Sequence, residues 1–327
     1  MKVAVVGATG VVGETILRVL DERRVPVDDV GRFASRTRGE VLETTPEALA
    51  QYDAVFFASS EDASEKYAPP LVQRGAVVID NSSTFRMRDG VPLIVPEVNA
   101  HALRPEHRLF PIGNCTAIIL CVALAPVRGT AGLSSVRVAT YQAISGAGRA
   151  ALEEFDRGEG NVVRNVVPQI GSFGEDGYTG EELKVAAETR KILELPQLPV
   201  FATAVRVPVR TAHSEAVFFE TARDTSVEEL AAAFERAPGV VFHHDGIVTP
   251  RDVEGTDLVH VGRLRICHDD AQRHPEVSKD PERVEGRQFQ MWIVGDQLRK
   301  GAATNGVQIL ELVMSLRQAQ GLSTSSG

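Results

Sequence analysis

The chain contains few cysteines and no long apolar run, and both features narrow the class of protein. Only three of its 327 residues are cysteines, Cys115, Cys121 and Cys267, and no two of them form a C-x-x-C pair. Three thiols cannot build a disulfide framework, so we expect a reducing compartment in which a thiol stays available for chemistry. No apolar run approaches the roughly 20 residues of a membrane-spanning helix.

Basic residues are also in deficit. The formal net charge is −9, from 35 Lys and Arg against 44 Asp and Glu. A nucleic acid or an anionic membrane needs a basic surface, so neither is expected as a partner, although a local basic pocket for a small anion remains compatible with this balance. No leader pattern precedes the first apolar segment, because Lys2 leads straight into VAVVGATG. We therefore expect a cytoplasmic protein.

The length of 327 residues exceeds the usual size of one core, so two domains are expected. Short apolar runs at 2–6, 30–35, 53–60 and 75–82 read as strands, and helical spacing follows the first of them and separates the last two. Strands that alternate with helices predict βαβ units and a mostly parallel sheet. The N-terminal part is therefore predicted to be an α/β domain of Rossmann type.

The character of the sequence changes near Cys115. TAIILCVALAPV reads as a continuous apolar helix, and strands with longer polar loops predominate from about Val136 onward. SVRVATYQAIS, FATAVRVPV, EAVFFETA and FQMWIVG have strand character, TSVEELAAAFERA reads as an amphipathic helix, and the tail from Ala302 reads as another helix. We predict an α+β second domain, with boundaries at 1–114 plus 301–327 and at 115–300.

A glycine-rich turn lies between the first strand and the first helix. Gly7, Gly10 and Gly13 form G-x-x-G-x-x-G, in which glycine allows a tight turn and close approach to a pyrophosphate at a helix N-terminus. The alternative is a tight turn without a ligand. About 20 residues further on, where an NAD site places Asp or Glu, the chain has Ser35-Arg36. A hydroxyl and a guanidinium suit a 2′-phosphate and favour NADP over NAD, the alternative being a solvated surface arginine.

Cys115 follows Gly113-Asn114 at the predicted start of the apolar helix. Asn114 is a good N-cap, and a thiol in the first helical turn lies at the positive end of the helix dipole, which favours the thiolate. The alternative is a buried thiol of the core, and that is our interpretation of Cys121, six residues further along the same helix.

GATGVVG, GNCTA, YQAISGAGR and RVPVRTAHSE, in this order and with these separations, resemble the aspartate-β-semialdehyde dehydrogenase family over nearly the full length. The resemblance implies an NADP-binding domain joined to a catalytic and dimerisation domain. It also implies the NADPH-dependent conversion of L-aspartyl-4-phosphate into L-aspartate 4-semialdehyde and phosphate through a cysteine thioester, on the route to lysine, methionine and threonine. A homodimer is implied as well, with a tetramer as the alternative.

The resemblance assigns roles residue by residue. Cys115 matches the nucleophile and His213 the acid/base. Gln142 matches a glutamine that holds the reacting substrate, and Arg206 the arginine that binds its α-carboxylate. The remaining substrate matches are Arg86, Asn114, Glu181 and Lys184, where Glu181 binds the amine and Arg86 and Lys184 bind phosphate. The cofactor matches are Gly7, Thr9, Gly10, Val11, Val12, Gly13, Ser35, Arg36, Ser145, Gly146 and Gln297.

Two other functions stay open. An N-acetyl-γ-glutamyl-phosphate reductase shares the chemistry, but its substrate lacks the free amine that Glu181 would bind. In a dinucleotide-binding regulatory protein Cys115 would be structural, and such a protein would need no combination of Cys115, Gln142, Arg206 and His213. The polar segment 267–287 contains Cys267, His268, Asp269 and His274, and residues 243–245 read HHD. Neither has paired metal-ligand spacing, so we interpret both as solvated loops and predict no metal.

Overall fold

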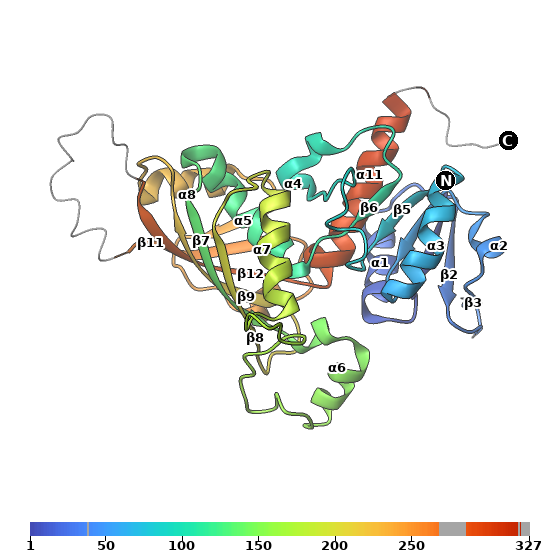
Figure 1. The fold of residues 1–327 in the computed structure, drawn as a ribbon, viewed down its shortest axis with the longest axis horizontal. Helices are drawn as coiled ribbons and strands as arrows, with labels where there is room; N and C mark the ends of the chain where they lie inside the picture. Colours follow the sequence, from blue (N-terminus) through green and yellow to red (C-terminus); the bar gives the residue numbers. More distant parts are fainter. Residues whose placement is uncertain (38, 268–285, 320, 322–327) are drawn as a thin grey trace. The chain divides into compact units, whose positions relative to one another are not determined.

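The computed structural model describes residues 1–37, 39–267, 286–319 and 321, and the chain divides into two compact units (Figure 1). The first unit is Met1–Cys115 with Gly301–Gly327, and the second is Thr116–Lys300. Within the described part of the chain, no helix has the length and apolar content of a membrane span.

The first unit contains a six-stranded sheet in the order β3-β2-β1-β4-β5-β6, and all its pairings are parallel. This order matches the Rossmann arrangement, and the near-continuous burial of β1, β4 and β5 fits strands covered on both faces. The Rossmann-type fold predicted from the sequence is therefore confirmed. The strands are β1 (Lys2–Val6), β2 (Asp29–Ala34), β3 (Leu42–Glu43), β4 (Ala54–Phe57), β5 (Val77–Asp80) and β6 (Leu109–Pro111).

The helices of this unit connect its strands, except for the last, which returns from the far end of the chain. The helix α11 packs against α1 and β5, and Glu311 on it pairs with Arg23 at a distance of 2.7 Å. Gly306 lets α11 approach the sheet, because a Cβ there would lie 2.7 Å from the side chain of Ile112. The helices are α1 (Val11–Glu22), α2 (Pro46–Leu49), α3 (Glu61–Gln73), α4 (Pro96–Asn99), the 3-10 turn η1 (Ala100–Ala102) and α11 (Thr304–Ala319).

The second unit contains a mixed six-stranded sheet in the order β10-β11-β12-β9-β7-β8. Along β7 the buried Val136, Val138 and Thr140 alternate with the exposed Arg137 and the half-buried Ala139, as expected for a sheet with one face on the core. The α+β class predicted for this part is confirmed. The strands are β7 (Ser135–Gln142), β8 (Val200–Arg206), β9 (His213–Glu220), β10 (Val240–His243), β11 (Val259–Ile266) and β12 (Gln288–Gly295).

Helices cover the core face of this sheet. The helix α7 packs against β8, and α8 packs against β10 and β11. The apolar helix predicted around Cys121 is α5, and most of its residues are buried. The boundary between the units falls after the first residue of α5 (Cys115–Ala131) and within the π-helical turn η3 (Arg299–Ala303). The other helices of the second unit are the 3-10 turn η2 (Ile144–Ala147), α6 (Arg149–Asp156), α7 (Gly180–Ile192), α8 (Val227–Arg236) and α9 (Pro250–Val253).

The structure corrects one prediction about the histidines. His243 is not in a solvated loop, because it ends β10, and its Nε2 lies 2.9 Å from Nδ1 of His260 on β11. The short run VVFH gains its strand partners only from the tertiary pairing with β11. His244, by contrast, is exposed and contacts Glu235. His268, Asp269 and His274 lie outside the described residues.

Candidate active site

Cys115 is the first residue of α5, so its thiol lies at the N-terminal end of a 17-residue helix. The side chain is partly exposed, whereas Cys121 is fully buried and burial raises the pKa of that thiol. The start of a helix favours a thiolate, whereas burial in an apolar helix disfavours it. The two cysteines therefore differ in their surroundings, as the sequence predicted: Cys115 lies at the helix start and Cys121 in the core.

The backbone beside Cys115 is closely approached by the π-helical turn η3. A Cβ built on Gly301 would lie 2.9 Å from Cβ of Cys115 and 3.2 Å from its Cα, closer than side-chain atoms normally come. A π-helical turn is rare and is found often at functional sites. Gly301 is therefore the residue that allows this turn to pack directly onto the candidate nucleophile.

The glycine loop of the first unit joins β1 to α1. Gly7 has φ of 82°, and a Cβ on it would lie 2.1 Å from the carbonyl oxygen of Ala58. Gly13 has a similar steric constraint, since its Cβ would lie 2.2 Å from the carbonyl oxygen of Gly7. These two glycines let the loop fold tightly against its neighbours, which explains their spacing.

The outer part of this loop fits a phosphate group. Thr9 is exposed, and Gly10, Val11 and Val12 are partly exposed. Gly10 is the N-cap of α1 and supplies no side-chain hydrogen bond to the first N–H groups of the helix. A helix that starts in this way presents its N–H groups and its positive dipole end to an anion.

Ser35 and Arg36 follow β2 directly, and both are exposed. The strand β2 is the neighbour of β1, and Gly7 and Ala8 donate backbone hydrogen bonds to the carbonyl oxygen of Phe33 near its end. The predicted 2′-phosphate contacts and the glycine loop therefore lie at the carboxyl ends of adjacent parallel strands, which is where such folds bind dinucleotides.

Arg86, also in the first unit, is buried rather than solvated. Its Nε donates to the carbonyl oxygen of Ser82 at 3.0 Å, and its Nη2 donates to that of Asn81 at 2.9 Å. The preceding loop is fixed by Asp80, whose carboxylate accepts hydrogen bonds from Ser64 and Ser82. Asn114, just before the nucleophile, is buried as well.

Four of the predicted residues of the second unit gather around the backbone of Ala143. The N–H of Ala143 donates to Nδ1 of His213 at 3.0 Å, and its carbonyl oxygen accepts from Nη1 of Arg206 at 2.6 Å. Gln142 precedes Ala143 and pairs with Arg206 in the sheet register. Glu181, at the start of α7, accepts a hydrogen bond of 3.0 Å from Nε2 of Gln142.

His213 is fully buried, and its surroundings set its protonation. Burial, together with the charge of Arg206, holds the pKa of His213 well below its usual value. Because Nδ1 accepts from a backbone N–H, the neutral ring carries its proton on Nε2. Nε2 lies 3.4 Å from the Cβ position of Gly146, and Gly146 is exposed. Nε2 of His213, which carries the proton, therefore lies next to Gly146, a residue without a side chain.

Gln297 and Ser145 lie beside this cluster in the second unit. Both are buried, Nε2 of Gln297 donates to Oγ of Ser145, and Oε1 of Gln297 accepts from the N–H of Ala212 at 2.9 Å. Ala212 precedes His213 and has φ of 68°, a left-handed conformation that is unfavourable for alanine. Gln297 thus helps to hold a strained residue next to the candidate acid/base.

The structure does not bring every predicted residue together. Lys184 is exposed on α7, one turn beyond Glu181, and among the described residues no hydrogen bond or ion pair joins it to the other candidate residues. Sequence reasoning also missed groups that act through the backbone. Ala143 and Ala212 carry no side-chain signal, whereas Glu182 was detectable, since Thr179 and Glu182 match the S/T-x-x-E capping box.

Comparison with known proteins identifies the family. The family model described as "Semialdehyde dehydrogenase, NAD binding domain" matches residues 2–105, and the one described as "Semialdehyde dehydrogenase, dimerisation domain" matches residues 124–300. Both ranges fall within the corresponding units of the structure.

Relatives match over almost the whole chain. The aspartate-semialdehyde dehydrogenase of Aquifex aeolicus is 40% identical over 347 residues, covering 96% of this chain and 98% of the relative. That of Bacillus subtilis is 37% identical over 354 residues, with coverage of 97% and 98%. The crystal structure of aspartate semialdehyde dehydrogenase II from Vibrio cholerae, complexed with ASA, has a TM-score of 0.85 at 36% identity and covers 96% of this chain and 98% of its own. The chain belongs to the aspartate-semialdehyde dehydrogenase family.

Proposed function

We propose that this chain is an NADP-dependent aspartate-semialdehyde dehydrogenase, which reduces L-aspartyl-4-phosphate to L-aspartate 4-semialdehyde and phosphate. The observation that carries the proposal is the cluster of Gln142, Glu181, Arg206 and His213 around Ala143. A regulatory dinucleotide-binding protein would have no use for an acid, an amide, a guanidinium and an imidazole in one place. The first unit is the NADP-binding domain in this proposal, and the second is the catalytic and dimerisation domain.

The charges of the cluster match the amino-acid end of the substrate. The guanidinium of Arg206 suits the α-carboxylate, which it can bind through two parallel hydrogen bonds. Glu181 supplies the negative charge for the α-ammonium group. Arg86, Lys184 and Asn114 are the proposed partners of the phosphate and the reacting carbonyl group.

The proposed chemistry begins at Cys115. Its thiolate, favoured by the N-terminus of α5, attacks the acyl carbon of the substrate, the C–O bond to phosphate breaks, and inorganic phosphate leaves. The product of this step is a thioester on Cys115. We assign the holding of the acyl group to Gln142, whose amide bonds to Thr140 and Glu181.

The second half of the reaction is a reduction. The thioester carbon becomes that of a thiohemiacetal when it accepts a hydride, which NADPH would supply when bound. Nε2 of His213 donates a proton to the oxygen of the thiohemiacetal as it forms and takes the proton back when the thiohemiacetal collapses. The collapse releases the aldehyde and returns the thiolate of Cys115. The backbone bond from Ala143 to Nδ1 fixes the ring for that transfer.

NADP, rather than NAD, is the proposed cofactor because of Ser35 and Arg36. Both are exposed at the end of β2, where an acidic residue would favour a ribose 2′-OH. A guanidinium and a hydroxyl there favour the 2′-phosphate instead.

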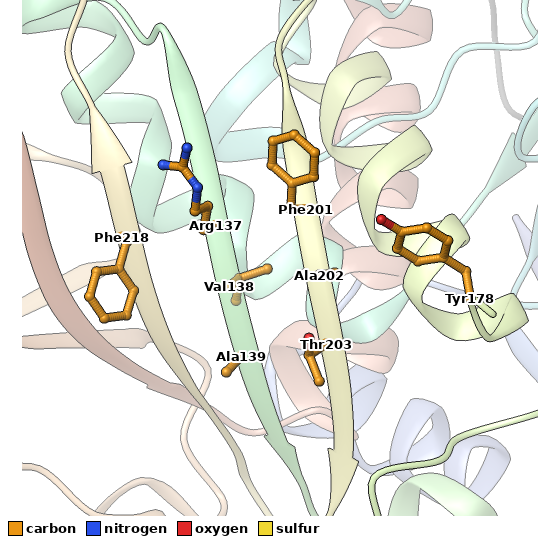
Figure 2. A pocket seen from close by; sticks show the side chains of 8 residues that line it. All are labelled: Arg137, Val138, Ala139, Tyr178, Phe201, Ala202, Thr203 and Phe218. Atoms are coloured by element: carbon orange, nitrogen blue, oxygen red, sulfur yellow. The ribbon is translucent and has the colours of Figure 1, made fainter. Parts of the chain in front are cut away.

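We also propose that a second copy of this chain binds the open face of the second-unit sheet. Figure 2 shows Phe218, Arg137 and Phe201 side by side on β9, β7 and β8, with Tyr178 nearby. They line a shallow cavity of about 580 Å³, and Phe201 is 50% exposed. None of the predicted site residues lines it, and an apolar patch of this kind is typical of a protein interface. The family's dimerisation domain covers these strands.

Light scattering tests the dimer. The double variant Phe201→Glu with Phe218→Glu should shift the mass from dimer to monomer, whereas Ile247→Glu, at a hydrophobic residue that is 74% exposed, should leave it unchanged. A wild-type monomer, or a double variant that stays dimeric, contradicts the proposal.

The activity is tested in the reverse direction, as phosphate-dependent reduction of NADP by aspartate semialdehyde. The same assay with N-acetylglutamate semialdehyde tests the alternative reductase. We expect turnover of the free amino aldehyde only, because the carboxylate of Glu181 is the proposed partner of an α-ammonium group, which the N-acetylated aldehyde lacks. Preference for the N-acetylated aldehyde, or no turnover of either, would refute the proposal.

A further inference from the structure

The second unit contains a buried carboxylate that the proposed mechanism does not use. Glu182 lies on the first turn of α7, next to Glu181, and is only 8% exposed. Its partner Thr179, the N-cap of α7, is fully buried. A buried carboxylate is retained at a cost unless its oxygens are satisfied by hydrogen bonds, so its contacts indicate what it does.

Both oxygens of Glu182 bind backbone N–H groups, and they do so on two different elements. Oε2 accepts from the N–H of Thr179 at 2.7 Å, while the hydroxyl of Thr179 accepts from the N–H of Glu182 at 3.3 Å. This pair forms the capping box of α7. Oε1 accepts from the N–H of Ala204 on β8 at 3.0 Å, which a capping box does not require.

Among the described residues β8 is the last strand of its sheet, so Ala204 lies on an edge strand. Its N–H points away from β7, and the same edge continues at Arg206, whose N–H and carbonyl oxygen pair with Val167. Glu182 therefore supplies the hydrogen-bond partner that the sheet lacks at this position, and it fastens the N-terminus of α7 to β8.

The two elements joined in this way carry the two charges proposed for the substrate. Arg206 is two residues beyond Ala204 on β8, and Glu181 is one residue before Glu182 on α7. The 3.0 Å bond between Glu181 and Gln142 also depends on where α7 begins relative to the sheet. We propose that Glu182 is a positioning residue that sets the spacing between Glu181 and Arg206, and through it the affinity for the α-amino-acid end of the substrate. The inference rests on the proposed function.

Glu182→Gln tests this role with little change in shape. In glutamine an NH2 group, which cannot accept a hydrogen bond, replaces one of the two carboxylate oxygens. One of the two hydrogen bonds, to Thr179 or to Ala204, is therefore lost. We expect KM for aspartate semialdehyde to rise about 10-fold, with kcat changed by less than about 3-fold, because binding geometry is altered and the nucleophile is not. The affinity for NADP, measured by titration without substrate, should stay at the wild-type value.

The chain offers a matched control on another helix. Glu229 closes the same type of capping box on α8, where its carboxylate accepts from the N–H of Ser226 at 3.1 Å and the hydroxyl of Thr225 at 2.8 Å. Glu229→Gln should lower the midpoint of urea unfolding, as expected for a weakened cap, with KM unchanged. Circular dichroism establishes that both variants are folded.

The outcomes separate the inference from the proposed function. A wild-type KM in Glu182→Gln, or an equal rise in KM in Glu229→Gln, overturns the positioning role. The proposed function still stands in that case, provided that the wild-type protein turns over aspartate semialdehyde. No turnover by the wild type overturns both. If Glu182→Gln fails to fold, Glu182→Asp, whose shorter carboxylate cannot reach both elements, is judged by the same criterion.

Discussion

The first unit places several of its candidate groups at helix starts and beside glycines, whereas the second unit gathers four polar side chains around the backbone of Ala143. In the first, Gly10 and Cys115 lie at helix starts, and glycines at 7, 13 and 301 allow close approach. In the second, Gln142, Glu181, Arg206 and His213 come from three strands and a helix and meet at Ala143. We therefore expect the first unit to respond to changes in main-chain geometry and the second to the loss of single polar atoms.

The largest effect is expected at Cys115. Cys115→Ser replaces the thiolate by a hydroxyl that is far less ionised, so kcat should fall by roughly 10³-fold or more. Steady-state turnover of aspartate semialdehyde measures this, and NADP affinity should be unchanged. Near wild-type turnover in the variant would remove the covalent step from the mechanism.

The second unit is tested next, at the ring that Ala143 orients. His213→Ala removes the proposed proton-transfer group, and kcat should fall by roughly 10²- to 10⁴-fold. The thiol remains, so the rate of Cys115 alkylation by iodoacetamide is a control that should change little. A rise in KM at constant kcat would instead assign His213 to substrate binding.

A third change tests whether main-chain packing fixes the nucleophile. Gly301→Ala adds a methyl group whose carbon would lie 2.9 Å from Cβ of Cys115, so the two segments must separate. A displacement of this kind should lower kcat by about 10- to 100-fold. Gly255→Ala is unsuitable as its control because that glycine has positive φ, whereas Gly129→Ala meets no atom within 4 Å and should keep full activity. Wild-type kcat in Gly301→Ala would show that the packing does not position the thiol.

The cofactor preference gives a smaller effect. Arg36→Ala removes one exposed guanidinium, and a charged hydrogen bond of this kind contributes about 1.5–3 kcal/mol. We expect the Kd for NADP to rise about 10-fold while the Kd for NAD changes little. Fluorescence titration of the wild type and the variant with NADP and with NAD measures the four Kd values. An unchanged preference for NADP would assign Arg36 to the solvated surface.

The smallest effect concerns Glu215, a buried residue that the mechanism does not use. Within the part of the chain that the structure describes, neither of its carboxylate oxygens has a hydrogen-bond partner, and burial raises its pKa well above the usual value. The folded protein therefore keeps a proton that the unfolded chain releases above about pH 4.5, so Glu215 lowers stability as pH rises. Glu215→Gln should remove this slope, so the loss of stability between pH 5 and pH 8 should be smaller in the variant than in the wild type.

Urea unfolding of the wild type and the variant at both pH values measures that difference. His213 has the opposite sign, since its lowered pKa makes stability fall as pH drops below 6.5, but it is present in both proteins and cancels. Parallel curves for the two proteins would contradict a protonated Glu215. The exposed Glu228, changed to Gln, should give a curve parallel to that of the wild type.

The class of each unit, the glycine loop and the position of Cys115 at a helix start could be predicted from the order of the amino acids alone, because these features depend on local periodicity and on residues close in the chain. Gln142, Arg206 and His213 lie within the quoted motifs, so the sequence was sufficient to nominate them as well. Folding then brings them together at Ala143, strains Ala212, packs Gly301 on Cys115 and fastens α7 to β8 through Glu182. These contacts depend on backbone atoms, which every residue has, and on pairings between distant segments, so no residue type signals them in advance.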